Sequence, residues 1–128
     1  IFGDRSHDTI PDLKEIEVGI FEMKTIDEIR ENAEARAWLD GEKPYMDFPE
    51  GETNDGFIER VARGLDMLKN DVVRSDVIGV LHGAVIFTCM AMMFPGVKDK
   101  PWQWTPNPAG GYAIAFENDT PVKYRKIG

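Results

Sequence analysis

The sequence predicts an α/β fold in which helices cover a mixed sheet. Two stretches carry apolar residues every three to four positions, which is typical of helices packed on a core. The segments between and after them are β-branched or alternate apolar with polar residues, which is typical of strands. The expected order is strand, helix, helix, strand, helix and then strands. The chain has 128 residues, and we expect residues 1–128 to form one domain.

The first expected element is a short extended segment, in which apolar and charged residues alternate from Leu13 to Val18. A helix is then expected to begin at Thr25, because Thr25 and Glu28 have the spacing of a capping box. The pair Asp40-Gly41 ends this helix. It would direct one side toward the core, with Ile26, Ile29, Ala33, Ala37 and Trp38.

A second, longer helix is expected from about Asn54 to Val73. Its apolar residues lie three and four positions apart, so one stripe of the helix is buried. The stripe consists of Phe57, Val61, Leu65, Leu68 and Val72. Arg60 and Arg63 lie on the same helix, and we expect both at the surface.

The stretch from Val77 to Phe94 has no charged residue and approaches the length of a membrane-spanning helix. His82-Gly83 interrupts it, with a β-branched run before (Val77 to Leu81) and an Ala- and Met-rich run after. This pattern favours a buried parallel strand that turns into a buried helix over a membrane span.

A loop with four prolines is expected from Pro95 to Gly111, with Trp102 and Trp104 covering the core. Alternating apolar residues on both sides of Asn118-Asp119 then predict a hairpin. Only the stretch from Val77 to Leu81 has the pattern of a strong buried strand. One buried strand is too few to cover so many apolar helical residues. We therefore expect central strands of the sheet to be missing from this sequence.

The charge balance argues against several classes of partner. The formal net charge is −8, which disfavours nucleic acid and anionic membrane surfaces. The single cysteine, Cys89, cannot form an internal disulfide, and we expect a cytoplasmic protein. The chain begins at Ile1 without a charged and apolar leader, which suggests that a preceding segment was removed.

His82 is the first candidate for chemistry, because it ends the expected strand directly before a helix. Ligands of open α/β sheets bind at that edge. Gly83 allows close approach of the backbone, and the next N–H groups, Ala84 included, would face a phosphoryl group at the positive end of the helix. The alternative is a histidine that makes only a local hydrogen bond.

Glu15 and Glu52 are the acidic candidates. Glu15 and Glu17 are expected on one face of the first extended segment, opposite Ile16, where Glu15 could act as a proton donor or simply face solvent. Glu52 precedes the second helix, and its simplest role is electrostatic stabilisation of the helix start.

Three segments together resemble the histidine phosphatase superfamily, the phosphoglycerate-mutase-like proteins. Leu13 to Gly19 resembles the family segment L-x-E-I-x-x-G, and Gly51-Glu52-Thr53 is similar to its G-E-S segment. Val77 to Ile86 resembles the V-x-H-G-G-x-I strand and turn. The stretch from Glu15 to Thr25 is most similar to the broad-specificity phosphatase and fructose-2,6-bisphosphatase branches.

The resemblance implies a three-layer α/β/α fold and phosphomonoester chemistry through a phosphohistidine. Glu15 would donate a proton to the leaving oxygen, and His82 would be the second pocket histidine. We expect Gly83, Ala84 and Glu52 to contact the substrate, a small phosphorylated metabolite. No metal or organic cofactor is implied, and phosphatase and mutase activity both stay open.

The sequence departs from the family pattern at its start. The family's nucleophile lies in an Arg-His-Gly motif after an apolar strand, whereas this chain has Arg5-Ser6-His7 in an expected loop. The first strand, the nucleophile and two phosphate-binding arginines have no counterpart. We therefore expect the chain alone to be inactive, and to pair through its sheet edge with an N-terminal fragment or a second copy.

Two non-catalytic alternatives stay open at this point. The first is a phosphate-ligand-binding or interaction module that kept the fold and lost the nucleophile. The second is a carbohydrate-binding module that uses Trp102 and Trp104 as a stacking platform.

Overall fold

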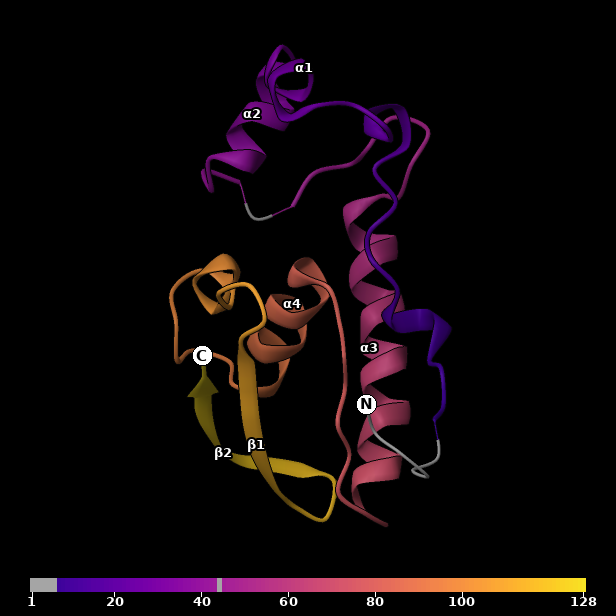
Figure 1. Ribbon diagram of the computed structural model, residues 1–128, viewed down its shortest axis with the longest axis vertical. Coiled ribbons are helices and arrows are strands. Elements are labelled where there is room, and N and C mark those ends of the chain that lie inside the picture. The colour runs from indigo at the N-terminus through magenta and orange to yellow at the C-terminus, as the bar shows by residue number, and fades with distance from the viewer. Residues whose placement is uncertain (1–6, 44) are drawn as a thin grey trace.

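The computed structural model describes residues 7–43 and 45–128 (Figure 1). The long helix α3 forms one side of the molecule, with α4 beside it and the segment before α1 running along it (Figure 1). The short helices α1 and α2 lie at one end, and a β-hairpin lies at the other. The bounds are α1 (Ile26–Arg30), α2 (Ala33–Leu39), α3 (Asn54–Val72), α4 (Gly83–Met93), β1 (Gly111–Glu117) and β2 (Thr120–Ile127).

Helix α3 confirms the prediction of a long amphipathic helix. Thr53 caps it by accepting a hydrogen bond from the Gly56 N–H at 3.1 Å. Phe57 and Val61 are fully buried, and Leu65 is nearly so. These residues pack in one core with Leu13 and Ile16 of the segment before α1. Val85 and Cys89 of α4 belong to the same core.

The expected single helix after Thr25 is wrong, because the structure has two short helices there. The capping box is present, with reciprocal bonds between Thr25 and Glu28, and it starts α1. Asn32 then adopts extended backbone, and its side chain accepts from the Ala35 N–H at 3.0 Å. This new cap starts α2 and ends the first helix after little more than one turn.

Helix α4 begins at Gly83, as predicted, and runs to Met93. The strand expected before it is not formed: residues 77–81 are irregular backbone and have no ladder partner among the described residues. They are also not buried, since Ile78 is 66% and Val80 83% exposed. The β-branched pattern alone could not form a strand, because β1 and β2 pair only with each other.

The C-terminal hairpin confirms the predicted strand pair. β1 and β2 are antiparallel, with Ile114 opposite Tyr124 and a turn at Asn118 with φ of 56°. The hairpin packs on the turn at Pro101–Trp104 through Trp104, which is 1% exposed and contacts Tyr112 and Tyr124 edge to face. Trp104 therefore covers the core, as expected.

The described residues thus combine helices with one two-stranded antiparallel sheet, and the α/β class is confirmed. The mixed, three-layer sheet that we expected is not seen in residues 7–43 and 45–128. Arg5 and Ser6 lie outside the described residues, and His7 lies in irregular backbone. No helix of the described residues is long and apolar enough to span a membrane.

Candidate active site

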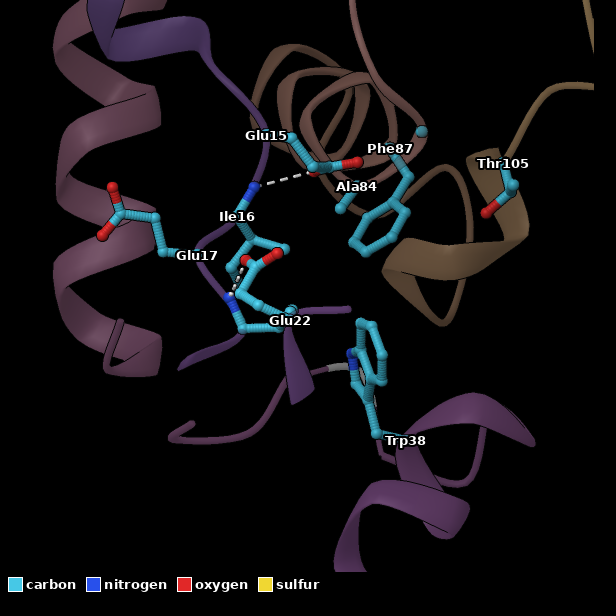
Figure 2. A pocket seen from close by; sticks show the side chains of 10 residues that line it. Glu15, Ile16, Glu17, Glu22, Trp38, Ala84, Phe87 and Thr105 are labelled. Atoms are coloured by element: carbon cyan, nitrogen blue, oxygen red, sulfur yellow. Dashed lines mark hydrogen bonds between the residues drawn. The ribbon is translucent and has the colours of Figure 1, made fainter. Parts of the chain in front are cut away.

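A cleft of about 550 Å³ opens between the segment that follows Leu13, helix α2 and the start of α4 (Figure 2). Glu15 and Glu22 contribute carboxyl groups to its lining. Trp38 of α2 and Phe87 of α4 contribute aromatic rings. Acidic and aromatic side chains therefore surround one open space.

Glu15 extends into this cleft. Figure 2 shows its carboxyl group on the side of Ala84 and Phe87. Its Oε1 accepts a hydrogen bond from the Ile16 N–H at 2.9 Å, and the side chain is half-buried. Ile16 itself is buried in the core, so it anchors the backbone next to Glu15. A carboxyl group held in this way can exchange a proton with a ligand in the cleft.

The expectation that Glu15 and Glu17 share one face is wrong. The Glu17 carboxylate points away from the cleft (Figure 2) and pairs with the Lys14 ammonium at 2.5 Å. The cause is a backbone contact, because the Glu17 N–H donates to Glu52 Oε2 at 2.9 Å. This bond sets the direction of the segment, which pairs with no strand in residues 7–43 and 45–128.

The start of α4 forms another part of the cleft, where Gly83 and Ala84 line it. His82 is the N-cap residue, and its carbonyl accepts from the Ile86 N–H at 2.9 Å. Its imidazole is exposed and does not cap the helix. The first N–H groups of α4 are thus left for other acceptors, at the positive end of the helix dipole.

The structure therefore brings together three of the predicted site residues, Glu15, Gly83 and Ala84. His82 adjoins them through the chain but does not line the cleft.

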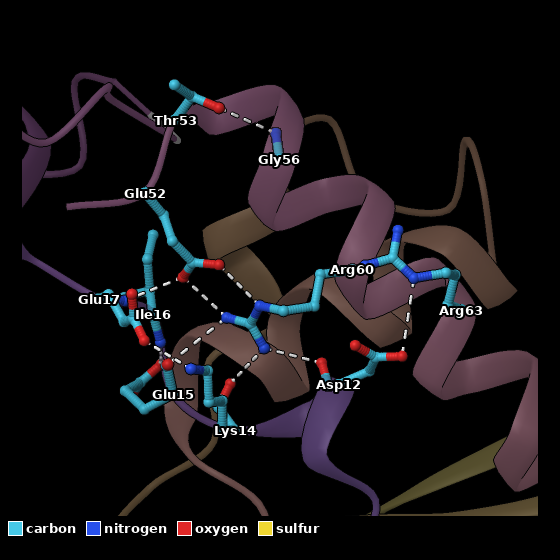
Figure 3. Close-up of polar contacts among 10 residues, drawn as sticks. All are labelled: Asp12, Lys14, Glu15, Ile16, Glu17, Glu52, Thr53, Gly56, Arg60 and Arg63. Carbon is cyan, nitrogen blue, oxygen red and sulfur yellow. Dashed lines mark hydrogen bonds and ion pairs between the residues drawn. The ribbon is translucent and has the colours of Figure 1, made fainter.

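Glu52 lies outside the cleft lining and faces Arg60 instead (Figure 3). Its two oxygens accept hydrogen bonds from Arg60 Nε at 2.7 Å and Nη2 at 2.8 Å. The Arg60 hydrogen bonds, with the one from the Glu17 N–H, hold the pKa of Glu52 below its ordinary value. The same pair raises the pKa of Arg60.

Arg60 is the residue that sequence reasoning placed wrongly. We expected it at the surface, but it is 7% exposed, whereas Arg63 is exposed as expected. The signal was its position: three residues after Phe57 and four before Gly64, which puts it on the buried stripe of α3. A charged residue on such a stripe requires a buried partner.

Two glycines let the backbone cross closely beside the site. A Cβ on Gly51 would meet Glu17 O and lie 2.6 Å from Gly19 N, and Gly19 has a positive φ of 55°. The crossing is held by the Ile20 N–H bond to Pro49 O and the Glu52 N–H bond to Glu17 O, at 3.0 and 2.9 Å. It fixes the segment with Glu15 against the start of α3.

Trp102 lies beside a neighbouring hollow of about 380 Å³ that shares Trp38 and Phe87 with the cleft. Its indole packs close to Gly41. Among residues 7–43 and 45–128, no group of three His, Cys, Asp or Glu side chains is placed to hold a metal ion.

Comparison with protein families gives one result for the chain. The family model described as histidine phosphatase superfamily, branch 1, matches residues 3–126. No curated protein and no solved structure gives a significant match.

Proposed function

The chain belongs to the histidine phosphatase superfamily, and we propose that it forms part of a phosphomonoester phosphatase or phosphoglycerate-mutase-like enzyme. The reaction proceeds through a phosphohistidine. The observation that carries the proposal is that the Glu15 carboxyl group and the start of α4 meet at one cleft. The Glu15 carboxyl group offers a proton, and the start of α4 offers N–H donors to phosphoryl oxygens.

In the proposed reaction, a histidine nitrogen attacks phosphorus while the bond to the leaving oxygen breaks. Glu15 gives its proton to that oxygen, so the alcohol leaves neutral. In the second step, Glu15 as carboxylate takes a proton from water, which attacks the phosphohistidine and releases phosphate. His82 and the N–H groups of Gly83 and Ala84 stabilise the charge on the phosphoryl oxygens.

The nucleophile is proposed to lie in an Arg-His-Gly segment that is not part of the printed sequence. The sequence contains no Arg-His-Gly, and its two histidines are His7 and His82. Glu15 and Glu22 direct carboxyl groups to the cleft, and no lysine or arginine is among the described residues that line it. The cationic groups that hold an anionic substrate are therefore proposed to come with the nucleophile. In that setting, residues 77–81 would join a central sheet of a three-layer fold.

The same lining favours one alternative, a non-catalytic phosphate-ligand-binding or interaction module of this fold. In that case the exposed His82 and the start of α4 bind the ligand weakly, and Glu15 transfers no proton.

Intact-mass analysis of the purified material, followed by assays with 4-nitrophenyl phosphate, separates these functions. The chain of 14.5 kDa alone is expected to give no hydrolysis. Together with a polypeptide carrying Arg-His-Gly, it is expected to hydrolyse the ester and to form a phosphohistidine on that polypeptide after acid quenching.

In the active preparation, Glu15→Gln should lower kcat by roughly 10²- to 10⁴-fold, the usual contribution of a general acid. Glu59→Gln, at an exposed position of α3, is the matched control and should leave kcat unchanged. Hydrolysis by the chain alone that His82→Ala abolishes would contradict the proposed source of the nucleophile. Absence of hydrolysis even with the added polypeptide would favour the binding module.

A further inference from the structure

Arg60 uses its whole hydrogen-bonding capacity on the segment that carries Glu15 and on its own counter-ion. Its guanidinium group has five N–H donors. Nη1 donates to the carbonyl oxygens of Asp12 at 2.7 Å and Lys14 at 2.9 Å. Nη2 donates to the Glu15 carbonyl at 3.4 Å, and the remaining two bonds go to Glu52 (Figure 3).

Glu52 holds the backbone on the other side of Glu15, at Glu17. Its Oε2 accepts from the Glu17 N–H at 2.9 Å, and its own N–H donates to the Glu17 carbonyl at 2.9 Å. The backbone is therefore held both before and after Glu15. Arg60 bonds to the backbone carbonyl of Glu15, while the Glu15 carboxyl group is directed at the cleft (Figure 2).

Such a pair is not needed for stability alone. Breaking a buried pair is costly, but replacing both charges by apolar residues of similar size is often neutral or stabilising. Apolar residues cannot donate hydrogen bonds to the backbone carbonyls of Asp12, Lys14 and Glu15, and they cannot accept one from the Glu17 N–H. Placement matters for proton transfer, since an error of about 1 Å in a catalytic group can cost roughly 10²-fold in rate.

We propose that Arg60, neutralised by Glu52, is the positioning residue that holds the Glu15 carboxyl group at the cleft. The proposal rests on the proposed function for the role of Glu15, and it concerns only the geometry of the segment from Asp12 to Glu17. Arg60 does not touch the substrate. It acts through the backbone on either side of the proton donor.

Nuclear magnetic resonance of the 128-residue chain tests the proposal without requiring catalysis. The reporter is the Ile16 amide proton, which donates to Glu15 Oε1, so that its chemical shift and its exchange rate depend on this hydrogen bond. The main variant is Glu52→Leu with Arg60→Met, which removes both charges and leaves neither unpaired. Arg63→Met is the matched control, because Arg63 lies on the same helix, is exposed and pairs with the Asp12 side chain at 3.6 Å, at the end of the segment away from Glu15.

The double variant is expected to stay folded, to lose the downfield shift that the hydrogen bond gives the Ile16 amide and to exchange that proton about tenfold faster. Arg60→Lys should keep the fold and lose part of the shift, because one ammonium cannot reach all of these acceptors. Arg63→Met should behave as the wild type. A folded double variant with the wild-type Ile16 shift would overturn the proposal.

A measurement on the wild type decides the matter if the double variant fails to fold. Five bonds should give Arg60 separate, slowly exchanging guanidinium N–H signals, whereas one averaged, rapidly exchanging signal would overturn the proposal. These results do not depend on catalysis. If Glu15→Gln leaves an active preparation unchanged, the proposed function fails while the positioning of Glu15 stands.

Discussion

Arg60 and Glu52 form a bidentate ion pair, with Nε–Oε1 and Nη2–Oε2 distances of 2.7 and 2.8 Å, at the start of α3. The Arg60 side chain is 9% exposed and that of Glu52 is 15% exposed, so water screens this pair less than a surface pair. The pair connects α3 to the segment that carries Glu15. Its integrity therefore affects both stability and the geometry of the candidate site.

Removal of Arg60 alone should be strongly destabilising. Arg60→Met leaves the Glu52 carboxylate without its partner in a mostly buried position, and we expect a loss of about 3 kcal/mol or more in the free energy of unfolding. Urea denaturation measures the change. Arg63→Met, which removes an exposed side chain, should change the value by less than about 0.5 kcal/mol. Equal effects of the two substitutions would contradict the assignment of a buried pair.

The stability should depend on pH through Glu52. Because Arg60 lowers the folded-state pKa of Glu52, folding favours the carboxylate. This contribution is complete above the ordinary value of 4.5 and is lost as the pH falls through the lowered value. The difference in unfolding free energy between wild type and Glu52→Gln should therefore be constant near neutral pH and shrink below about pH 4.5. A difference that does not change down to pH 2 would exclude this linkage.

The close crossing at Gly51 should not accept a side chain. Gly51→Ala places a Cβ against the Glu17 carbonyl and 2.6 Å from the Gly19 nitrogen, and both are backbone atoms that cannot move aside cheaply. We expect a loss of about 1–3 kcal/mol, as for other overpacked sites. Thermal unfolding measures it, with Gly111→Ala as control, because an added Cβ there has no atom within 4 Å. A Gly51→Ala variant as stable as this control would show that the crossing is loose.

Cys89 should be unreactive in the folded protein. It is 4% exposed, and burial raises the pKa of its thiol to about 12, so almost no thiolate is present at pH 8. A disulfide reagent such as 5,5′-dithiobis(2-nitrobenzoate) should modify it only as the protein unfolds, with one thiol per chain in denaturant. Rapid stoichiometric reaction without denaturant would contradict the burial of Cys89 against α3.

The sequence was sufficient to predict elements whose pattern is local. The apolar stripe of α3, the helix after His82 and the alternation around Asn118 each lie within one stretch, and all three elements form as expected. The break between α1 and α2 was missed because the Asn32 cap interrupts a pattern that otherwise continues. Residues 77–81 were misplaced because a strand needs a partner, which no local pattern reveals.

The candidate site followed the same rule. The motif around Glu15 and the turn at Gly83 were identifiable from the sequence, and the structure brings both to one cleft. The burial of Arg60 was not identifiable from the sequence, because it depends on Glu52 and on carbonyl groups more than forty positions away. The orientation of Glu17 was missed for the same reason, since it follows from a bond to Glu52.

The most direct test of a phosphoryl site at the start of α4 is a titration of the ¹⁵N-labelled chain with inorganic phosphate at constant ionic strength. The amide signals of Gly83 and Ala84 should shift with a saturable dependence on phosphate, and His82→Ala should weaken that binding. Sodium chloride at matched ionic strength is the control. Phosphate-dependent shifts confined to surface lysines such as Lys98 and Lys100, with Gly83 and Ala84 unchanged, would contradict a phosphoryl site at this cleft.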